Sequence, residues 1–443
     1  MIGTQYPVDV RETIPSAIES NTILNIATHC VTAYTHGFHK YPAKFIPHVP
    51  RWAIDKYLNR QKRNLILDPF CGSGTTLVEG ILAGHNAIGI DIDPLSVLIT
   101  KVKITPVDVT QLSKICDWIS KEIKDQKQKG TFKPACSNIT HWFTSDAITK
   151  LSLIRTLIDQ IPQRFGHSKQ NKDISDLLLI CFSSIIRRVS NADNESQKTY
   201  VSHTKVKEPE ETMSLFLAQL NFFKERIAEF SVRIDPNLRR QIICSSSAED
   251  LNTKLGGRIV DIVITSPPYI KAIDYIYNQM VELFWIGDLF DMNTQAKQNT
   301  RKEHYIGTKH LPKRKFAQYT PFSETLGISE LDEKLKAVYT NDKKNGHKHA
   351  YVAFKYFTDM DRHFAEVAKC LNSNAHYIMV VGDSSVSDVF FETTKFLTDI
   401  AERNGFKIVN KWGYQIKNRY MRFDRKGRGG IIEIDWVLDF IKT

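Results

Sequence analysis

Several features are absent from this sequence of 443 residues, and each absence excludes a class of protein. The seven cysteines include no Cys-x-x-Cys pair, which argues against a structural zinc site, and the chain is too long for a small disulfide-stabilised scaffold. The most apolar stretch, residues 177–186, is shorter than the roughly 20 apolar residues that span a bilayer. Residues 1–20 contain no apolar core of the kind found in signal peptides. We therefore expect a cytoplasmic protein with reduced thiols and no membrane span.

Positive charge is in excess, because the chain has 60 Lys and Arg against 49 Asp and Glu, a net charge of +11 at pH 7. The basic residues cluster in residues 301–315, 342–349 and 417–428, and the first and last of these segments also contain Tyr or Phe. Such a mixture suits phosphates and exposed bases, so a nucleic acid is the expected partner. A general effect on solubility is the simpler alternative.

The pattern of apolar residues predicts an α/β protein with a long helical middle. Residues 65–68 and 85–92 are typical of buried strands, and helices are expected after them at 75–83 and 94–102. This alternation indicates a parallel sheet, whose ligands bind at the carboxyl ends of the strands. Further strands are predicted at 241–244, 259–265 and 376–381, helices at 351–371 and 389–404, and an antiparallel hairpin that closes the sheet at 407–415 and 431–440.

The chain is expected to contain one catalytic domain with two insertions. Residues 1–104 and 241–443 form the α/β domain in this interpretation. Residues 105–240 form a helical insertion, which either contributes to target recognition or only supports the fold. Residues 293–350 form an irregular basic insertion and a candidate DNA contact.

A glycine-rich segment, DPFCGSGTT at residues 68–76, lies between the first predicted strand and its helix. Gly72 and Gly74 let the backbone pass close to a bound molecule, and the start of the helix offers free N–H groups. A tight strand-to-helix turn is the simpler alternative. A dinucleotide-binding loop would have a third glycine where this chain has Leu77, and a phosphate-binding loop would continue with Gly-Lys-Ser/Thr. Both of these ligand classes are therefore disfavoured.

Two acids accompany this segment, Asp68 at the end of the first strand and Asp91 at the end of the second. Asp91 can accept hydrogen bonds from both ribose hydroxyls of a nucleoside, while Asp68 faces a cationic amino group. This arrangement suits S-adenosylmethionine.

The segment TSPPY at residues 265–269 follows another apolar strand. Two prolines can simply stop a strand. They also hold a backbone carbonyl and a hydroxyl in fixed orientation beside an aromatic ring. Such a group can bind an exocyclic amine and stack on a planar base that has left the duplex.

These segments resemble the motifs of the amino-group DNA methyltransferases, which modify N4 of cytosine or N6 of adenine. DPFCGSGTT resembles their cofactor loop and SPPY their catalytic tetrapeptide. HKYPAKF at residues 39–45 is similar to the element that closes over the methionine end of the cofactor. ELFW at 282–285 and YIG at 305–307 are similar to a subgroup of bacterial site-specific enzymes. The resemblance implies a Rossmann-like sheet with a C-terminal antiparallel hairpin, and S-adenosylmethionine as cofactor.

The resemblance also implies roles for individual residues. The family's expected Gly-Asp-Ala is Ser-Ser-Ala in this chain, so Ser247 or Asp250 must replace the acid that contacts the cofactor adenine. The 14 histidines have irregular spacing, and no metal is expected. The implied catalytic residues are Ser266, Pro267, Pro268 and Tyr269, and the implied cofactor-binding residues are Lys44, Phe45, Asp68, Pro69, Phe70, Gly72, Gly74, Thr75, Asp91, Ile92, Ser247 and Asp250.

The substrate follows from the residue before Pro-Pro-Tyr, since family members with Ser there mostly act on cytosine N4 and those with Asp or Asn on adenine N6. We therefore predict methylation of a flipped cytosine in double-stranded DNA, as part of restriction-modification with a cognate endonuclease. The alternatives are an N6-adenine enzyme, an RNA amino-group methyltransferase and a non-catalytic nucleic-acid-binding subunit. The predicted DNA contacts are Arg301, Lys302, Lys313, Arg314, Lys315, Arg422 and Arg425, with solvated surface charge as the alternative for the last two.

Overall fold

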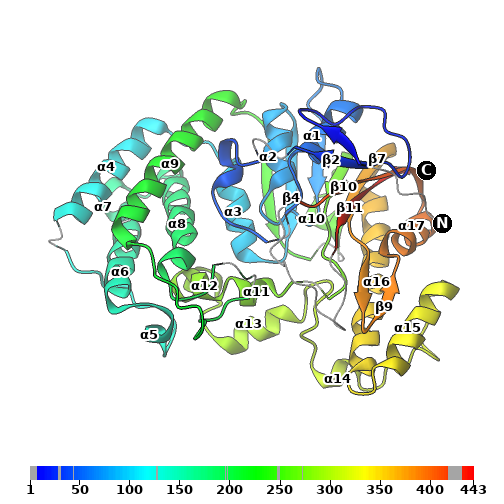
Figure 1. Cartoon of the computed structure of the whole chain (residues 1–443). Helices are drawn as coiled ribbons and strands as arrows, with labels where there is room; N and C mark the ends of the chain where they lie inside the picture. Colours follow the sequence, from blue (N-terminus) through cyan, green and yellow to red (C-terminus); the bar gives the residue numbers. More distant parts are fainter. Residues whose placement is uncertain are drawn as a thin grey trace.

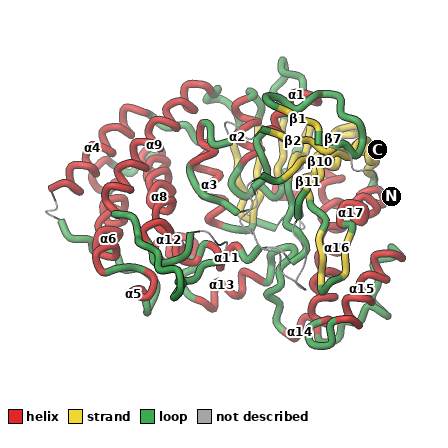
Figure 2. The backbone as a smooth tube through the Cα atoms, in the orientation of Figure 1, coloured by secondary structure: helices red, strands yellow, loops and turns green. Residues whose placement is uncertain are grey.

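The computed structural model describes residues 7–27, 31–42, 44–125, 128–194, 196, 198–246, 250–271, 273–417 and 432–443. One half of the molecule consists of helices, whereas the strands gather in the other half together with further helices (Figures 1 and 2). The strands are β1 Val8–Val10, β2 Ile23–Ile26, β3 Leu65–Asp68, β4 Asn86–Asp91, β5 Arg240–Cys244, β6 Val260–Thr265, β7 Leu371–Val381, β8 Ser384–Val386, β9 Val389–Phe391, β10 Phe406–Gln415 and β11 Ile434–Lys442.

The described helices fall into three groups along the chain. The first group is η1 Tyr34–Gly37, α1 His48–Tyr57, α2 Thr75–Leu82 and α3 Pro94–Ile104. The second is α4 Val109–Asp125, α5 Ile139–Trp142, α6 Ser145–Asp159, α7 Ile161–Phe165, α8 Lys169–Val189 and α9 Thr212–Arg233. The third is α10 Leu251–Lys254, α11 Tyr275–Asn278, α12 Met280–Ile286, η2 Gly287–Phe290, α13 Gln295–Lys302, α14 Lys313–Phe316, α15 Ser329–Asn341, α16 Gly346–Cys370 and α17 Thr393–Arg403.

Nine strands form one sheet in the order β1-β2-β10-β11-β7-β6-β3-β4-β5. The strands from β7 to β5 are parallel, whereas β11 runs antiparallel to both β7 and β10. From β3 the chain proceeds outward through β4 to β5 and then returns to β6, on the other side of β3. This reversal opens a crevice at the carboxyl ends of β3 and β6, where α/β sheets bind their ligands. The fold is therefore the predicted Rossmann-like sheet with an antiparallel C-terminal hairpin.

The sheet is covered on both faces because side chains alternate along its strands. Ile66 of β3 and Ile262 of β6 face the layer that contains α1. Leu67 and Val263, one residue further along each strand, face the layer of α16 and α17. Apolar residues on both faces explain why these short strands are nearly continuous apolar runs in the sequence.

The second group of helices forms the predicted helical region, and its core continues into α2 and α3. Leu178 and Phe182 of α8 are buried there together with Phe223 of α9. No helix within the described ranges combines the length and the apolar character that crossing a membrane requires.

Three expectations about the fold were wrong. The hairpin does not close the sheet, because β2 pairs with β10 in parallel and β1 follows at the edge. The helix expected at 389–404 begins only at Thr393, since Ser387 and Asp388 adopt positive φ and form the turn of the small β8–β9 hairpin. Residues 293–350 are not irregular but contain α13, α14 and α15.

Candidate functional site

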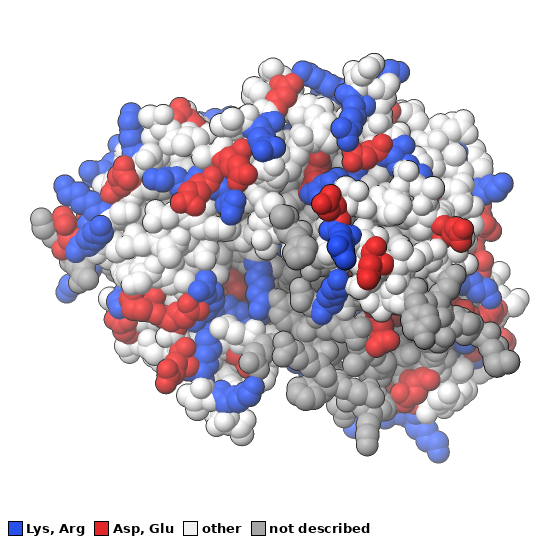
Figure 3. All heavy atoms as spheres, turned by 45° about the horizontal axis from the view of Figure 1, so that its top comes forward, with Lys and Arg blue, Asp and Glu red and all other residues white. Residues whose placement is uncertain are grey.

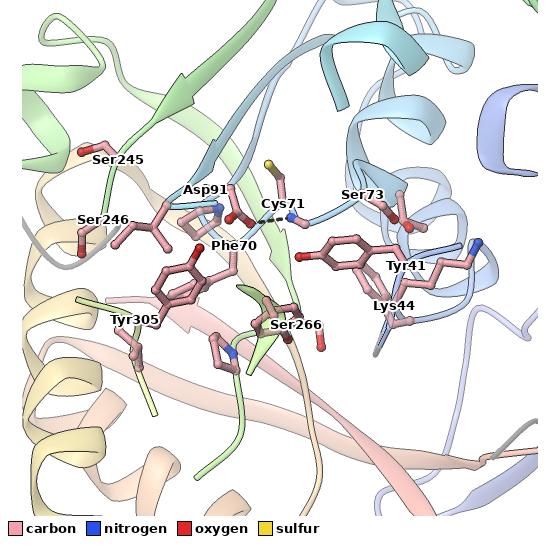
Figure 4. A pocket seen from close by; sticks show the side chains of 18 of the residues that line it. Tyr41, Lys44, Phe70, Cys71, Ser73, Asp91, Ser245, Ser246, Ser266 and Tyr305 are labelled. Atoms are coloured by element: carbon pink, nitrogen blue, oxygen red, sulfur yellow. Dashed lines mark hydrogen bonds between the residues drawn. The ribbon is translucent and has the colours of Figure 1, made fainter. Parts of the chain in front are cut away.

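A cavity of about 720 Å³, including its open mouth, lies at the carboxyl ends of β3, β4 and β6. Segments far apart in the sequence meet there, and Tyr41, Asp91 and Ser266 surround the same space (Figure 4). The lining residues are Tyr41, Lys44, Phe45, Pro69, Phe70, Cys71, Gly72, Ser73, Thr75, Asp91, Ile92, Ser245, Ser246, Ser266, Pro268, Tyr275, His304, Tyr305 and Ile306.

The loop after β3 is held by the acid at the end of β4. The Gly72 backbone N–H donates to Asp91 Oδ2 over 2.8 Å (Figure 4), and the Asp93 N–H donates to Asp91 Oδ1, also over 2.8 Å. Gly72 has a φ of +48°, and a Cβ at this position would lie 3.1 Å from the ring of Tyr41. Glycine therefore allows both the turn and the close approach of the loop to the cavity wall.

Asp68 is fully buried directly behind this loop, and its carboxylate is only half satisfied. Oδ1 accepts hydrogen bonds from Thr265 Oγ1 over 2.6 Å and from the Phe70 N–H over 3.1 Å. Oδ2 is buried without a hydrogen-bond partner. Desolvation raises the pKa of Asp68 to about 6, although these hydrogen bonds oppose the rise. A buried, unpaired carboxylate oxygen is costly in isolation and suits a cationic ligand.

Desolvation also raises the pKa of Asp91 to about 7, and the nearby charge of Asp93 adds to the shift. Asp93 itself is buried and caps α3 by accepting from the Leu95 N–H over 2.9 Å. Asp91 lines the cavity, whereas Asp68 and Asp93 are buried outside its lining, and together the three acids at the ends of two neighbouring strands give the site a field that favours cations.

The SPPY segment joins the same cavity through Ser266 and Pro268. Pro267 is buried between them. Tyr269 lies beyond the cavity, and its hydroxyl donates to Asp435 Oδ1 on β11 over 2.6 Å. The four residues therefore extend from the cavity toward the C-terminal hairpin.

The upstream element contributes Phe45 and the aliphatic part of Lys44 to the wall. The Lys44 ammonium points away from the middle of the cavity (Figure 4) and donates to the His36 carbonyl over 3.3 Å. His36 is in turn buried against Glu79, with 2.9 Å between Nε2 and Oε1. Through His36 and Glu79, this element is therefore held against helix α2.

Three tyrosines form one wall of the cavity, and the sequence did not identify them as site residues. The ring of Tyr275 is stacked between Tyr41 and Tyr305, at centroid distances of 5.8 and 6.3 Å. The Tyr305 hydroxyl is buried without a hydrogen-bond partner. The HKYPAKF similarity for Tyr41 and the YIG similarity for Tyr305 were the available signals, but the basic residues beside Tyr305 led us to assign that segment to DNA.

Some predicted cofactor residues lie elsewhere. Gly74 is not part of the lining: it precedes α2 with a φ of +79°, and a Cβ there would lie 2.7 Å from Thr100 Cγ2. Asp250 is exposed at the start of α10 and is also outside the lining, where Ser245 and Ser246 are found instead. Ser247 lies outside the described residues.

Comparison with known proteins identifies the family. A model of the DNA methylase family matches residues 17–101. Over 433 residues the chain is 24% identical to the type II methyltransferase M.MvaI of Kocuria varians, covering 91% of this chain and 88% of that protein. The identity to M.BsoBI of Geobacillus stearothermophilus is also 24%, covering 87% and 80%. M.MjaII of Methanocaldococcus jannaschii is 41% identical over 100 residues, or 22% and 18% of the two chains. The chain is an amino-group DNA methyltransferase.

The methyl donor of this methyltransferase is S-adenosylmethionine, and the cavity fits it. The unpartnered Asp68 Oδ2 suits an ammonium group. Each Asp91 oxygen accepts one backbone N–H and retains capacity for a hydroxyl. The tyrosine wall offers aromatic faces for a planar base or a cation. Among the described residues, no group of three His, Cys, Asp or Glu side chains is placed to hold a metal ion.

The basic segment of the methyltransferase is only partly available to DNA. Lys302 is 8% exposed, and its ammonium lies 3.0 Å from Asp274 Oδ2, which argues against its assignment as a phosphate contact. Arg301 donates to the carbonyl of Ile92 over 3.3 Å, beside the cavity. Arg314, by contrast, has a side chain that is 78% exposed.

Lys313 and Lys315 flank Arg314 on α14, and Lys315 lies 3.4 Å from Glu303 Oε2. Arg422 and Arg425 lie outside the described residues. On the face shown in Figure 3, basic and acidic side chains are intermixed, and no patch of a single sign covers the helical region. This favours the scaffold interpretation for that surface.

Proposed function

We propose that this methyltransferase modifies the exocyclic N4 of a flipped cytosine in double-stranded DNA. One observation carries the proposal: Ser266 and Pro268 line the same cavity as Gly72 and Asp91. A group that can bind an amine therefore lies beside a group that can bind the cofactor. The serine before Pro-Pro-Tyr supports cytosine over adenine.

In this proposal the cofactor is held from three sides. Asp68 binds its ammonium group, Asp91 its ribose hydroxyls, and the tyrosine wall covers it opposite the loop at Gly72. Lys44 and Phe45 flank the methionine portion through their apolar surfaces. S-adenosylmethionine supplies an electrophilic methyl group on a sulfonium sulfur.

The SPPY residues activate the amine, which is a poor nucleophile because its lone pair is delocalised into the ring. The Ser266 hydroxyl and the Pro267 carbonyl each accept one amine hydrogen, which favours a pyramidal nitrogen with an available lone pair. The proton that the amine loses passes by way of the Ser266 hydroxyl to solvent. No enzyme nucleophile is needed, and burial raises the pKa of the Cys71 thiol well above its ordinary value, so Cys71 is poorly suited to that role.

Base flipping costs a few kcal/mol, and stacking on Tyr269 offsets about 1–3 kcal/mol of it. Lys313, Arg314 and Lys315 are the proposed phosphate contacts. The similarity to type II methyltransferases supports a role in restriction-modification beside a cognate endonuclease.

The test is incubation with cofactor labelled in the methyl group and with duplex DNA, followed by digestion to nucleosides and identification by mass. Labelled N4-methylcytosine is the expected product. Labelled N6-methyladenine would establish the adenine alternative, and label only in RNA would refute a DNA substrate. Ser266→Ala should remove incorporation while cofactor affinity changes less than twofold, because this hydroxyl is assigned to the amine.

A further inference from the structure

The ring of Tyr269 is held at its hydroxyl end by the C-terminal hairpin. Its hydroxyl donates to Asp435 Oδ1 over 2.6 Å. Asp435 is the second residue of β11, and β11 runs antiparallel to β7. The beginning of β11 therefore lies at the same edge of the sheet as the carboxyl ends of β6 and β7, where Tyr269 is found.

A glycine at the end of β7 makes the second contact with this ring. A Cβ at Gly382 would lie 3.4 Å from Cε2 and 3.5 Å from Cζ of Tyr269, and 2.7 Å from Cγ2 of Ile432. The backbone of Gly382 thus supports the ring close to the hydroxyl. A hydrogen bond at one point and a backbone surface beside it fix both the position and the plane of the ring.

Stacking alone does not require this arrangement, since a phenylalanine ring offers the same aromatic surface. Asp435 is largely shielded from solvent, and desolvation raises its pKa while the hydroxyls of Tyr269 and Tyr414 oppose the rise. Shielding a carboxylate is unfavourable unless a donor satisfies it. The shielded carboxylate of Asp435 therefore lowers the stability of the free protein, and the benefit that we assign to the pair is an ordered Tyr269 ring.

We propose that Asp435 is a positioning residue for the target base: its hydrogen bond to the hydroxyl fixes the ring plane of Tyr269 on which the flipped base stacks. This inference rests on the proposed stacking role of Tyr269. Asp435 acts through the tyrosine and does not itself touch the base.

The experiment compares two DNA duplexes that contain the enzyme's target sequence. This sequence is first determined from the position of the methylated base in plasmid DNA. One duplex is intact, and the other has an abasic site at the target position, where no base can stack. Dissociation constants for both are measured with the full chain in the presence of S-adenosylhomocysteine. Variants that disturb stacking should weaken binding to the intact duplex only.

Asp435→Leu, which leaves no acceptor for the hydroxyl, and Tyr269→Phe should each weaken binding to the intact duplex about tenfold, within the roughly 5- to 150-fold that stacking of one base is worth. Binding to the abasic duplex should change less than twofold. The double variant should be no weaker than either single variant, because both remove the same hydrogen bond.

The chain offers a matched control on the same strand. Asp439, four residues further along β11, is fully buried and accepts from the Tyr57 hydroxyl, but it lies toward the opposite edge of the sheet. Asp439→Leu removes the acceptor from a similar Tyr–Asp pair and should leave the ratio of the two dissociation constants unchanged. Thermal unfolding of all variants shows how much each pair contributes to folding.

Two results would overturn the proposal. In the first, Asp435→Leu leaves binding to both duplexes unchanged. In the second, it weakens binding to both equally, as Asp439→Leu would if it merely loosened the sheet. Tyr269→Ala separates this failure from failure of the proposed function. If Tyr269→Ala binds both duplexes like the parent, Tyr269 does not stack on the base at all, and the inference falls with its premise.

Discussion

Asp68 makes the affinity for the cofactor dependent on pH in a way that can be calculated. Its pKa is raised to about 6 in the free protein, chiefly by desolvation. If the ionised carboxylate binds the ammonium group, the fraction ready to bind is about 0.97 at pH 7.5 and about 0.09 at pH 5. Affinity should therefore fall about tenfold between these pH values. Asp68→Asn should remove this dependence and weaken binding at pH 7.5 by about 1.5–3 kcal/mol, the usual contribution of a hydrogen bond to a charged group.

The assay is calorimetric titration at several pH values with two ligands. S-adenosylmethionine carries the ammonium group, whereas methylthioadenosine retains only the nucleoside and the sulfur. Asp91, whose pKa is raised to about 7 by desolvation and by the charge of Asp93, affects both ligands through the ribose. The ratio of the two affinities therefore cancels Asp91 and isolates Asp68.

The same pKa fixes the sign of an effect on folding. The pKa of Asp68 is higher in the folded protein, at about 6, than its ordinary value of 3.8. Its contribution to stability is therefore fully present below about pH 4 and is lost as the pH rises through 6. The difference amounts to about 3 kcal/mol. Asp68→Asn should raise the free energy of unfolding of the unliganded protein at pH 8 relative to the parent, and much less at pH 4.

Two results would contradict this role of Asp68: an affinity ratio that stays constant from pH 5 to 7.5, or Asp68→Asn binding S-adenosylmethionine as tightly as the parent at pH 7.5. Either result would mean that the unpartnered oxygen of Asp68 does not meet the ammonium group. If Asp68→Asn and the parent had the same free energy of unfolding at pH 8, the Asp68 carboxylate would not be buried in solution.

Two further predictions concern single contacts. Gly74→Ala should lower the free energy of unfolding in urea denaturation by about 2–5 kcal/mol, because it combines a left-handed backbone with a clash against Thr100. Gly84→Ala is the control: its φ is +84°, but no atom lies within 4 Å of the new Cβ, so the free energy of unfolding should fall by only about 1–2 kcal/mol. Similar losses of unfolding free energy for Gly74→Ala and Gly84→Ala would show that the structure relaxes and removes the clash with Thr100. Arg314→Ala should reduce the slope of log affinity for DNA against log salt by about 0.9, while Lys302→Met should not change it because its ammonium is already paired inside the protein. A reduced slope for Lys302→Met would place its ammonium on DNA.

The sequence was informative where local signals determine structure. The βαβ unit could be predicted because Asp68, two glycines and Asp91 follow apolar runs at regular spacing, and Ser266 was placed by the strand before it. The edge of the sheet could not be predicted, since β2 has four residues and pairs with β10 almost 400 positions away. Such a strand has no pattern of its own and is defined only by its partner.

The tyrosine wall escaped prediction for a related reason. Tyr41, Tyr275 and Tyr305 belong to three distant segments, and stacking between them has no sequence period. Tyr41 lies within the HKYPAKF segment and Tyr305 within YIG, yet neither tyrosine was singled out, and beside Tyr305 the basic residues gave the stronger signal. Charge in a sequence indicates what a surface can attract, but it does not show whether a side chain is at the surface.

Lys302 shows what that distinction means for this enzyme. Asp274, which begins α11 shortly after the SPPY segment, accepts from Lys302 at 3.0 Å and lies 2.7 Å from His310 Nε2. These contacts connect the segment that follows SPPY in the sequence to the segment that contains Tyr305. Part of the positive charge that suggested a nucleic acid therefore braces the wall of the cofactor cavity. Net charge agrees with the DNA substrate that the family implies, yet one of the lysines that produced the signal is paired inside the protein, beside the proposed site of methyl transfer.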